Sequence, residues 1–254
     1  MPLKINREPT TILNLNKMKT NKFLVATLAA FVSISSYAQT VDEIVDKHVA
    51  AMGGMDKLKG VNTIVIDRTL SVQSMEIPSK TTIVVGKALR SESTVMGNSM
   101  VQVVDGTTGW MIRPAMMGGT GDPEDMPAEM VKQQVGQLDP FGPLVNYKDK
   151  GNKVELVGKE KVEKDDAYHL KITTKDGQTM DEYIDANTYM LTKLKTTMNG
   201  QEGEITFSDY KDFEGIKIAN TMDMTSQMGA LTFITNKVVI NAKVDDAIFK
   251  KPAK

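Results

Sequence analysis

Residues 61–72, VNTIVIDRTLSV, carry the pattern that decides the fold of this chain. Two sets of side chains alternate along this stretch: Ile64, Ile66, Leu70 and Val72 against Val65, Asp67, Thr69 and Ser71. Successive side chains of a β-strand point to opposite faces, so a period of two predicts a strand with a buried face.

The same alternation recurs along most of the chain, in segments bounded by Gly, Asn or Asp turn signals. These further strands are predicted at residues 80–86, 89–96, 99–105, 108–113, 153–158, 166–174, 178–185, 189–198, 202–210, 216–228 and 230–240. Asp176-Gly177 and Asn199-Gly200 are typical of hairpin turns between antiparallel strands.

Two stretches show the helical period instead. Residues 41–52 place Ile44, Val45, His48, Val49 and Met52 on one face. Thr40 and Glu43 match a capping box, Gly53-Gly54 ends the helix, and a short helix is expected at 55–59. Pro127 to Gln137 is the second helical stretch, with proline suited to its first turn.

About ten or eleven antiparallel strands with few helices cannot form a flat, covered sheet, because wide sheets twist and curl. We therefore predict a mainly β (α+β) fold, a curled antiparallel sheet forming an incomplete half-barrel. Helix 41–52 and segment 115–140, the predicted lid, are expected to close its concave face. A small, fully packed barrel is the alternative.

Methionine dominates the inventory of functional side chains. The chain has 18 methionines, two histidines and no cysteine. Methionine is flexible and suits surfaces that repack around variable apolar partners. We therefore expect an apolar ligand-binding cavity and lid formed by Ile64, Ile66, Met96, Met100, Trp110, Ile112, Met116, Met117, Met126, Met130, Met190, Leu194, Met198, Met222, Met224 and Met228.

Two other interpretations of the methionines remain open. Ordinary core filling explains any single methionine better than a ligand does. Copper binding by Met222 and Met224 is disfavoured, because neither cysteine nor clustered histidine supports it. We expect no metal and no cofactor.

Catalytic groups are scarce. His48 lies on the apolar face of helix 41–52, and His169 is expected to face away from Tyr168 and Leu170. Residues 121–125 cluster three carboxylates in a loop without the spacing of a calcium site, and a solvated acidic turn is the better interpretation. Phosphate-loop, HExxH and GxSxG motifs do not occur in the sequence. We predict no catalytic residues and no enzymatic activity.

The amino terminus predicts export. Lys17, Lys19 and Lys22 precede an apolar run from Phe23 to Ile34, and a Ser-Tyr-Ala triplet ends at Ala38. We predict a signal peptide at 1–38, in which 1–17 form an upstream extension from a misread start, and a single domain at 39–254. Residues 1–38 hold five basic residues and one acidic residue, so 26 basic and 31 acidic residues remain beyond them, a net charge of −5. This balance disfavours nucleic acid and anionic membranes as partners. Without cysteine, neither disulfides nor an acylated amino-terminal anchor are expected.

Three segments together resemble a known family. Residues 104–114, VDGTTGWMIRP, join a strand, Asp-Gly-x-x-x-Trp, a short strand and a proline before the predicted lid. Residues 209–218 resemble a late hairpin, and residues 244–252 a closing Asp-x-x-x-Phe-x-x-Pro pattern. In order and spacing, residues 40–252 resemble the LolA-type periplasmic lipoprotein carriers and their LolB-type relatives. Ala51-Met52-Gly53-Gly54 resembles a branch of exported, outer-membrane lipoprotein-sorting-like proteins.

The resemblance implies an open β half-barrel with a helical lid, an apolar cavity for acyl chains, and a periplasmic location. In such carriers an arginine on an early concave strand holds the lid closed. Arg68 and Arg90 are the candidates here, and Arg68 shares a face with Ile64 and Ile66. An arginine extending to the sheet rim is the competing interpretation. The partners implied are a lipidated protein or free amphiphile, with donor and acceptor proteins in the envelope.

The sequence thus predicts a carrier of acyl chains involved in outer-membrane lipoprotein sorting. A non-catalytic sensor or interaction module of the same fold is the second hypothesis, which a long exposed apolar edge would favour. A hydrolase acting through the acidic loop is the third, and it requires carboxylates converging on a pocket.

We expect the exported protein to begin at Gln39, because small residues at Ser36 and Ala38 fit signal peptidase. Amino-terminal sequencing of protein recovered from the cell envelope checks this. Recovery of the intact apolar run in the membrane fraction would contradict it.

Overall fold

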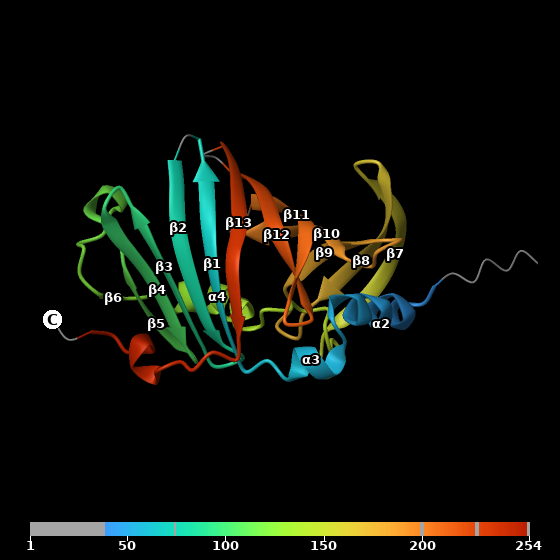
Figure 1. The fold of residues 1–254 in the computed structure, drawn as a ribbon, viewed down its shortest axis with the longest axis horizontal. Helices are drawn as coiled ribbons and strands as arrows, with labels where there is room; N and C mark the ends of the chain where they lie inside the picture. Colours follow the sequence, from blue (N-terminus) through green and yellow to red (C-terminus); the bar gives the residue numbers. More distant parts are fainter. Residues whose placement is uncertain (1–38, 74, 199–200, 227–228, 253–254) are drawn as a thin grey trace, which may run out of the picture. The chain divides into compact units, whose positions relative to one another are not determined.

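Thirteen antiparallel strands form one sheet, in the order β6-β5-β4-β3-β2-β1-β13-β12-β11-β10-β9-β8-β7 (Figure 1). The computed structural model describes residues 39–73, 75–198, 201–226 and 229–252. β6 and β7 are the two edges, and in this part of the chain no pairing joins them. The sheet is therefore an incomplete half-barrel, which confirms the predicted fold class.

Most of the strands lie within two residues of their predicted bounds, but β2, β7 and β11 extend further and the short β6 was not predicted. Their bounds are β1 Thr63–Val72, β2 Met75–Val84, β3 Ala88–Val95, β4 Asn98–Asp105, β5 Thr108–Ile112, β6 Glu124–Asp125, β7 Lys153–Val162, β8 Asp165–Thr173, β9 Thr179–Asp185, β10 Leu191–Met198, β11 Gln201–Phe213, β12 Ile216–Ser226 and β13 Gly229–Ile240. β2 begins five residues before the predicted start, because Pro78 is accommodated opposite Thr69 of β1. The predicted Asn199-Gly200 turn lies outside the described residues.

Alternation gives this sheet an inner and an outer face, and both carry apolar side chains. On β4 and β5, Val104 and Met111 join the main core on the inner face. Their neighbours Val103 and Trp110 join a second, smaller core on the outer face. The sheet is thus covered on both sides at this end.

Helix α2, Val41–Met52, begins and ends as the sequence predicts. Thr40 and Glu43 form the capping box. At the other end Gly53 adopts φ 128°, and a Cβ there would lie 2.3 Å from the carbonyl oxygen of Gly215. Only glycine permits this close approach of the helix end to the β11–β12 turn.

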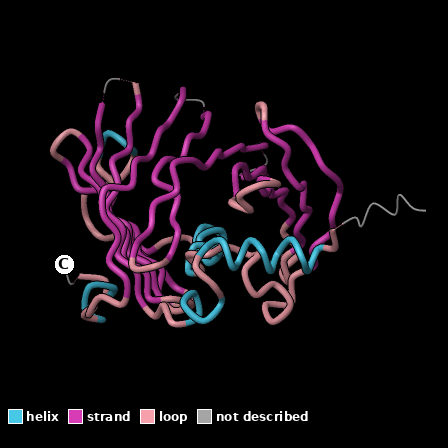
Figure 2. Tube along the Cα trace, turned by 45° about the vertical axis from the view of Figure 1, so that its right-hand side comes forward, coloured by secondary structure: helices cyan, strands magenta, loops and turns pink. Residues whose placement is uncertain are grey.

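The remaining helices are short, and Figure 2 shows most of them toward one end of the strands, with η2 at the opposite end. They are α3 Met55–Lys59, η2 Ala115–Met117, α4 Ala128–Gln134, η3 Val135–Leu138 and η4 Asp246–Phe249. The helix predicted at 127–137 is therefore α4 followed by a 3-10 turn. None of the described helices has the length and apolarity required to cross a bilayer.

Phe249 closes the outer core. Its side chain is buried with Ala88, Val101, Val103 and Trp110, and its carbonyl oxygen accepts a 2.7 Å hydrogen bond from the Trp110 indole. The carboxy-terminal segment therefore fixes the environment of the single tryptophan.

Phe249→Ala should lower the free energy of unfolding by about 3 kcal/mol, because it leaves a cavity in this core. It should also shift native Trp110 emission to the red as water reaches the indole. Thermal unfolding and fluorescence check both effects. Phe213→Ala, at a half-buried phenylalanine on β11, is the matched control and should leave the emission unchanged. An unshifted Phe249→Ala spectrum would contradict the assignment.

Candidate ligand-binding cavity

A cavity of about 390 Å³ lies on the inner face of the sheet. Strands β1 and β9–β12 supply its walls, and α2 together with residues 136–143, the cover segment, closes it. Its apolar lining includes Met52, Ile64, Ile66, Phe141, Met180, Leu191, Leu194, Phe207, Ile218, Ala219 and Met222. The volume lies at the lower end of the range typical of small-molecule sites.

Strand register brings the apolar wall together. Phe207 of β11 lies opposite Met222 of β12, and Leu194 of β10 lies opposite Glu182 of β9. Directly opposed residues share a face, so these side chains contribute to one surface built from the consecutive strands β9–β12.

His48 brings α2 into the cavity lining. Its Nδ1 lies 2.7 Å from the carbonyl oxygen of Tyr189, which can only accept, so Nδ1 carries the proton. Burial lowers the pKa of His48 below its usual value. The ring is then neutral at pH 7, and Nε2 is an acceptor.

An ion pair organises the cover segment. Lys150 pairs with the carboxylate of Asp139 and donates a 2.8 Å hydrogen bond to the carbonyl oxygen of Gly142. The other oxygen of Asp139 accepts from the Phe141 amide at 3.2 Å. One lysine thus holds both ends of the 139–142 turn over the cavity.

Glu182 is the unexpected member of the wall. Its side chain lines the cavity, yet the residue is only 4% exposed. Burial raises its pKa to about 7, against a partial opposing effect of Lys150. Glu182 was not among the predicted site residues. Its sequence signal is that it interrupts the alternating apolar residues Met180 and Ile184, which places a carboxylate on the buried face of the strand.

Arg68 lies in the cavity wall on β1, and burial lowers its pKa. Its Nε donates a 3.3 Å hydrogen bond to Thr235 Oγ1 on the adjacent strand. Arg68 was predicted to hold the lid closed. Among the described contacts, its side-chain hydrogen bond goes to the sheet and not to segment 115–140, so that role stays a prediction.

Five of the residues predicted for the site line this cavity: Ile64, Ile66, Arg68, Leu194 and Met222. Within the described lining, the methionines are Met52, Met180 and Met222, and only Met222 was predicted. The lining is therefore mixed aliphatic, aromatic and polar, and methionine does not dominate it.

The other predicted strand and turn methionines lie elsewhere. Met96 is 69% exposed in the β3–β4 turn, and Met116 and Met117 are exposed in η2. Met100, Met190 and Met224 are half-buried outside the cavity lining. The side chain of Met198 and the whole of Met228 lie outside the described residues.

The predicted lid needs a correction. Met126 is buried in the main core beside Gly109 of β5, and Met130 packs against the same core. Helix α4, which begins just after Met126 and contains Met130, therefore covers the β5 end of the sheet. Residues 136–143, at and just beyond the end of the predicted lid, cover the cavity instead.

The predicted position of Trp110 and Ile112 beside the cavity is wrong. Both side chains pack in the outer core, with Arg90 stacked 5.6 Å from the Trp110 ring. The alternation of β5 is correct, but both of its faces are covered, so an apolar side chain does not identify the cavity side.

The remaining polar candidates are occupied by ion pairs. His169 faces away from Tyr168 and Leu170 as predicted, but its ring is held between Glu160 at 2.8 Å and Asp181 at 2.7 Å. In the acidic loop, Glu124 pairs with Arg113 at 3.1 Å and Asp125 with Lys251 at 2.8 Å. Two carboxylates with different cations do not form the converging pair that a hydrolase requires.

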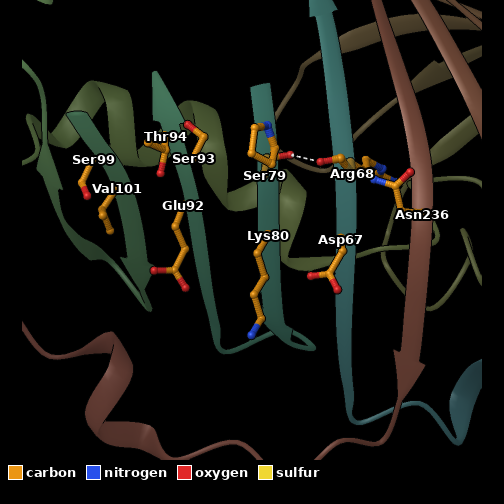
Figure 3. Close-up of a pocket in the computed structure, with 11 residues that line it drawn as sticks. Asp67, Arg68, Ser79, Lys80, Glu92, Ser93, Thr94, Ser99, Val101 and Asn236 are labelled. Atoms are coloured by element: carbon orange, nitrogen blue, oxygen red, sulfur yellow. Dashed lines mark hydrogen bonds between the residues drawn. The ribbon is translucent and has the colours of Figure 1, made fainter. Parts of the chain in front are cut away.

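A second hollow, of about 400 Å³, lies across β1–β4. Figure 3 shows Asp67, Lys80 and Glu92 along it from three neighbouring strands, with the hydroxyl of Ser79 bonded to the carbonyl oxygen of Arg68. Its open, charged lining suits water better than an apolar chain. The inner cavity is therefore the better candidate site.

Glu182→Gln should stabilise the protein in a pH-dependent way. The folded-state pKa of Glu182 is about 7, raised from its ordinary 4.5, so the native state binds its proton more tightly. The stability cost of Glu182 is absent below pH 4.5, grows as pH rises, and reaches roughly 3 kcal/mol above pH 7. Denaturant unfolding of both proteins between pH 4.5 and pH 8 checks this, with Glu155→Gln, an exposed glutamate on β7, as control. A constant difference across that range would contradict it.

Comparison with known proteins supports the fold. No protein-family model and no curated protein matches the chain. Among solved structures, an outer membrane lipoprotein-sorting protein domain from Vibrio parahaemolyticus is similar over 84% of this chain and 98% of its own, with TM-score 0.52 and 16% identity. A LolA superfamily protein from Nitrosomonas europaea is similar over 84% and 99%, with TM-score 0.55 and 12% identity. The chain therefore has a LolA-like fold.

Proposed function

We propose that this protein is a non-catalytic periplasmic carrier, which binds acyl chains of lipoproteins or of another amphiphile. The cavity between the sheet and α2 carries the proposal, because it offers Ile66, Leu194, Phe207 and Met222 as one apolar wall. The lipoprotein-sorting description of the similar Vibrio domain supports a role in outer-membrane lipoprotein sorting.

Apolar burial would supply the binding energy. A sixteen-carbon chain would gain up to roughly 10 kcal/mol at about 0.8 kcal/mol per methylene, before ordering costs. A cavity of about 390 Å³ is small for a drug-sized or larger ligand, so it would hold one chain or part of one. Release would require a partner that binds the opened state better.

The edge of the sheet favours the carrier over a sensor or docking module. Edge strand β7 carries Lys153, Glu155, Lys159, Glu160 and Lys161. Charged side chains on an edge oppose pairing with another strand. Val157 is exposed there, but it is isolated between charged neighbours. The described residues of this edge therefore present no continuous apolar surface to a partner.

Protein purified from the envelope should carry an amphiphile that native mass spectrometry and solvent extraction detect. Met222→Lys should abolish this cargo, because it places an ammonium group in the apolar wall. Met116→Lys, at an exposed methionine outside the cavity, should retain it. Thermal unfolding verifies that both variants are folded. A folded Met222→Lys protein with undiminished cargo would overturn the proposal.

A further inference from the structure

We propose that Glu182 selects the ligand, by binding a hydrogen-bond-donating group, an ammonium or a hydroxyl, that the amphiphile carries into the cavity. This inference rests on the proposed carrier function and adds the chemical class of the cargo. The carboxylate would accept the donor while the apolar wall holds the adjoining chain.

Packing of the sheet does not explain why residue 182 carries a carboxylate. Met180 and Ile184 flank it along β9, and Leu170 and Leu194 lie opposite it on β8 and β10. All four neighbours on its face of the sheet are apolar. A leucine or methionine would fill the same place without a desolvation cost.

The carboxylate also lacks a partner. In the part of the chain that the structure describes, no hydrogen bond or ion pair reaches Glu182, although the residue is 96% buried. Lys150 is close enough to influence its pKa, but the ammonium is already bound to Asp139 and Gly142. Buried polar groups almost always have partners, and the oxygens of Glu182 reach the cavity, so a group that enters the cavity can bind them.

The other titratable and charged groups of the cavity are engaged elsewhere. His48 donates to Tyr189, Tyr210 donates to Leu191 at 2.8 Å, and Arg68 donates to Thr235. Lys217 lies 4.0 Å from Asp212. Those that face Glu182 or line its cavity are His48, Arg68, Asp139, Lys150, Tyr210 and Lys217.

Arg68 is the buried cationic group that competes with Glu182, whereas Lys217 lies 4.0 Å from Asp212. Arg68 would favour an anionic head group, and it lies on β1, five positions from β9 in the sheet order. The cavity lining offers two acceptors to a ligand, the carboxylate of Glu182 and neutral His48, whose proton is on Nδ1. A ligand that supplies a hydrogen-bond donor would therefore complement these acceptors.

The test uses matched ten-carbon ligands that displace diphenylhexatriene, a hydrocarbon probe without polar groups. Decylamine, decan-1-ol and decanoic acid are compared on the wild type, Glu182→Gln, Glu182→Leu and the control Glu155→Gln. The wild type should prefer the amine or the alcohol to decanoate by roughly tenfold, the size expected for one charge-assisted hydrogen bond.

The two substitutions of Glu182 distinguish selection of an ammonium donor from selection of a hydroxyl donor. Glu182→Gln keeps an acceptor but loses the charge, so it should lose an amine preference and retain an alcohol preference. Glu182→Leu should lose both the amine preference and the alcohol preference, and the control Glu155→Gln should keep the preference of the wild type. An amine preference should also weaken near pH 5, where Glu182 is protonated and decylamine stays charged.

Failure of the inference and failure of the carrier proposal give different results. If the probe and all ligands bind but the head-group ranking is the same in every variant, Glu182 is not the selector and the carrier stands. A preference for decanoate that survives both substitutions assigns selection to Arg68 and overturns the inference. If neither probe nor ligand binds the wild type, both proposals are wrong.

Discussion

The pairing of β1 with β13 is the interaction on which the rest of this structure depends. It joins a strand near the start of the described chain to one near its end, through nine residue pairs from Ile64–Ile240 to Val72–Leu231. On one side of this seam lie β2–β6 and on the other β7–β12. The cavity takes walls from β1 and from β9–β12, so it exists only once the seam has formed.

This pairing closes a loop that contains most of the domain. The cost in chain entropy on loop closure comes before the side chains of the two strands can pack and stabilise the pairing. Asn241 offsets part of that cost at one end of the seam. It accepts a 2.7 Å hydrogen bond from the Asn62 amide and donates one of 3.0 Å to the Gly60 carbonyl oxygen. A register shift between Asp67 and Arg68 interrupts the ladder further along, where Arg68 bonds to Thr235. The pairing of β1 with β13 thereby also positions the guanidinium of Arg68 in the cavity wall.

Local pattern was sufficient to predict the strands, the capped helix α2 and an open sheet, because each depends on side chains close in sequence. The cavity depended on more distant facts. Trp110 and Met111 alternate correctly, but sequence does not say that η4 covers one face of β5 and α4 the other. Met126 shows the same limit, since its burial beside Gly109 follows from where the chain returns to the sheet. Methionine content indicated an adaptable surface, but most of the described methionines lie outside the cavity lining.

Glu182 shows what sequence reasoning discards when it searches for apolar stripes. A carboxylate between Met180 and Ile184 looks like an irregularity in a strand, yet among the described residues it is a cavity-lining carboxylate without a hydrogen-bond partner. A purely apolar cavity would bind any chain of suitable length, with little discrimination between head groups. In the proposed selection, the buried carboxylate would destabilise the empty protein and favour only ligands that supply a donor. Part of the stability of the fold would thus be exchanged for selectivity, and Lys150 would not cancel that exchange while Asp139 holds it in the cover segment.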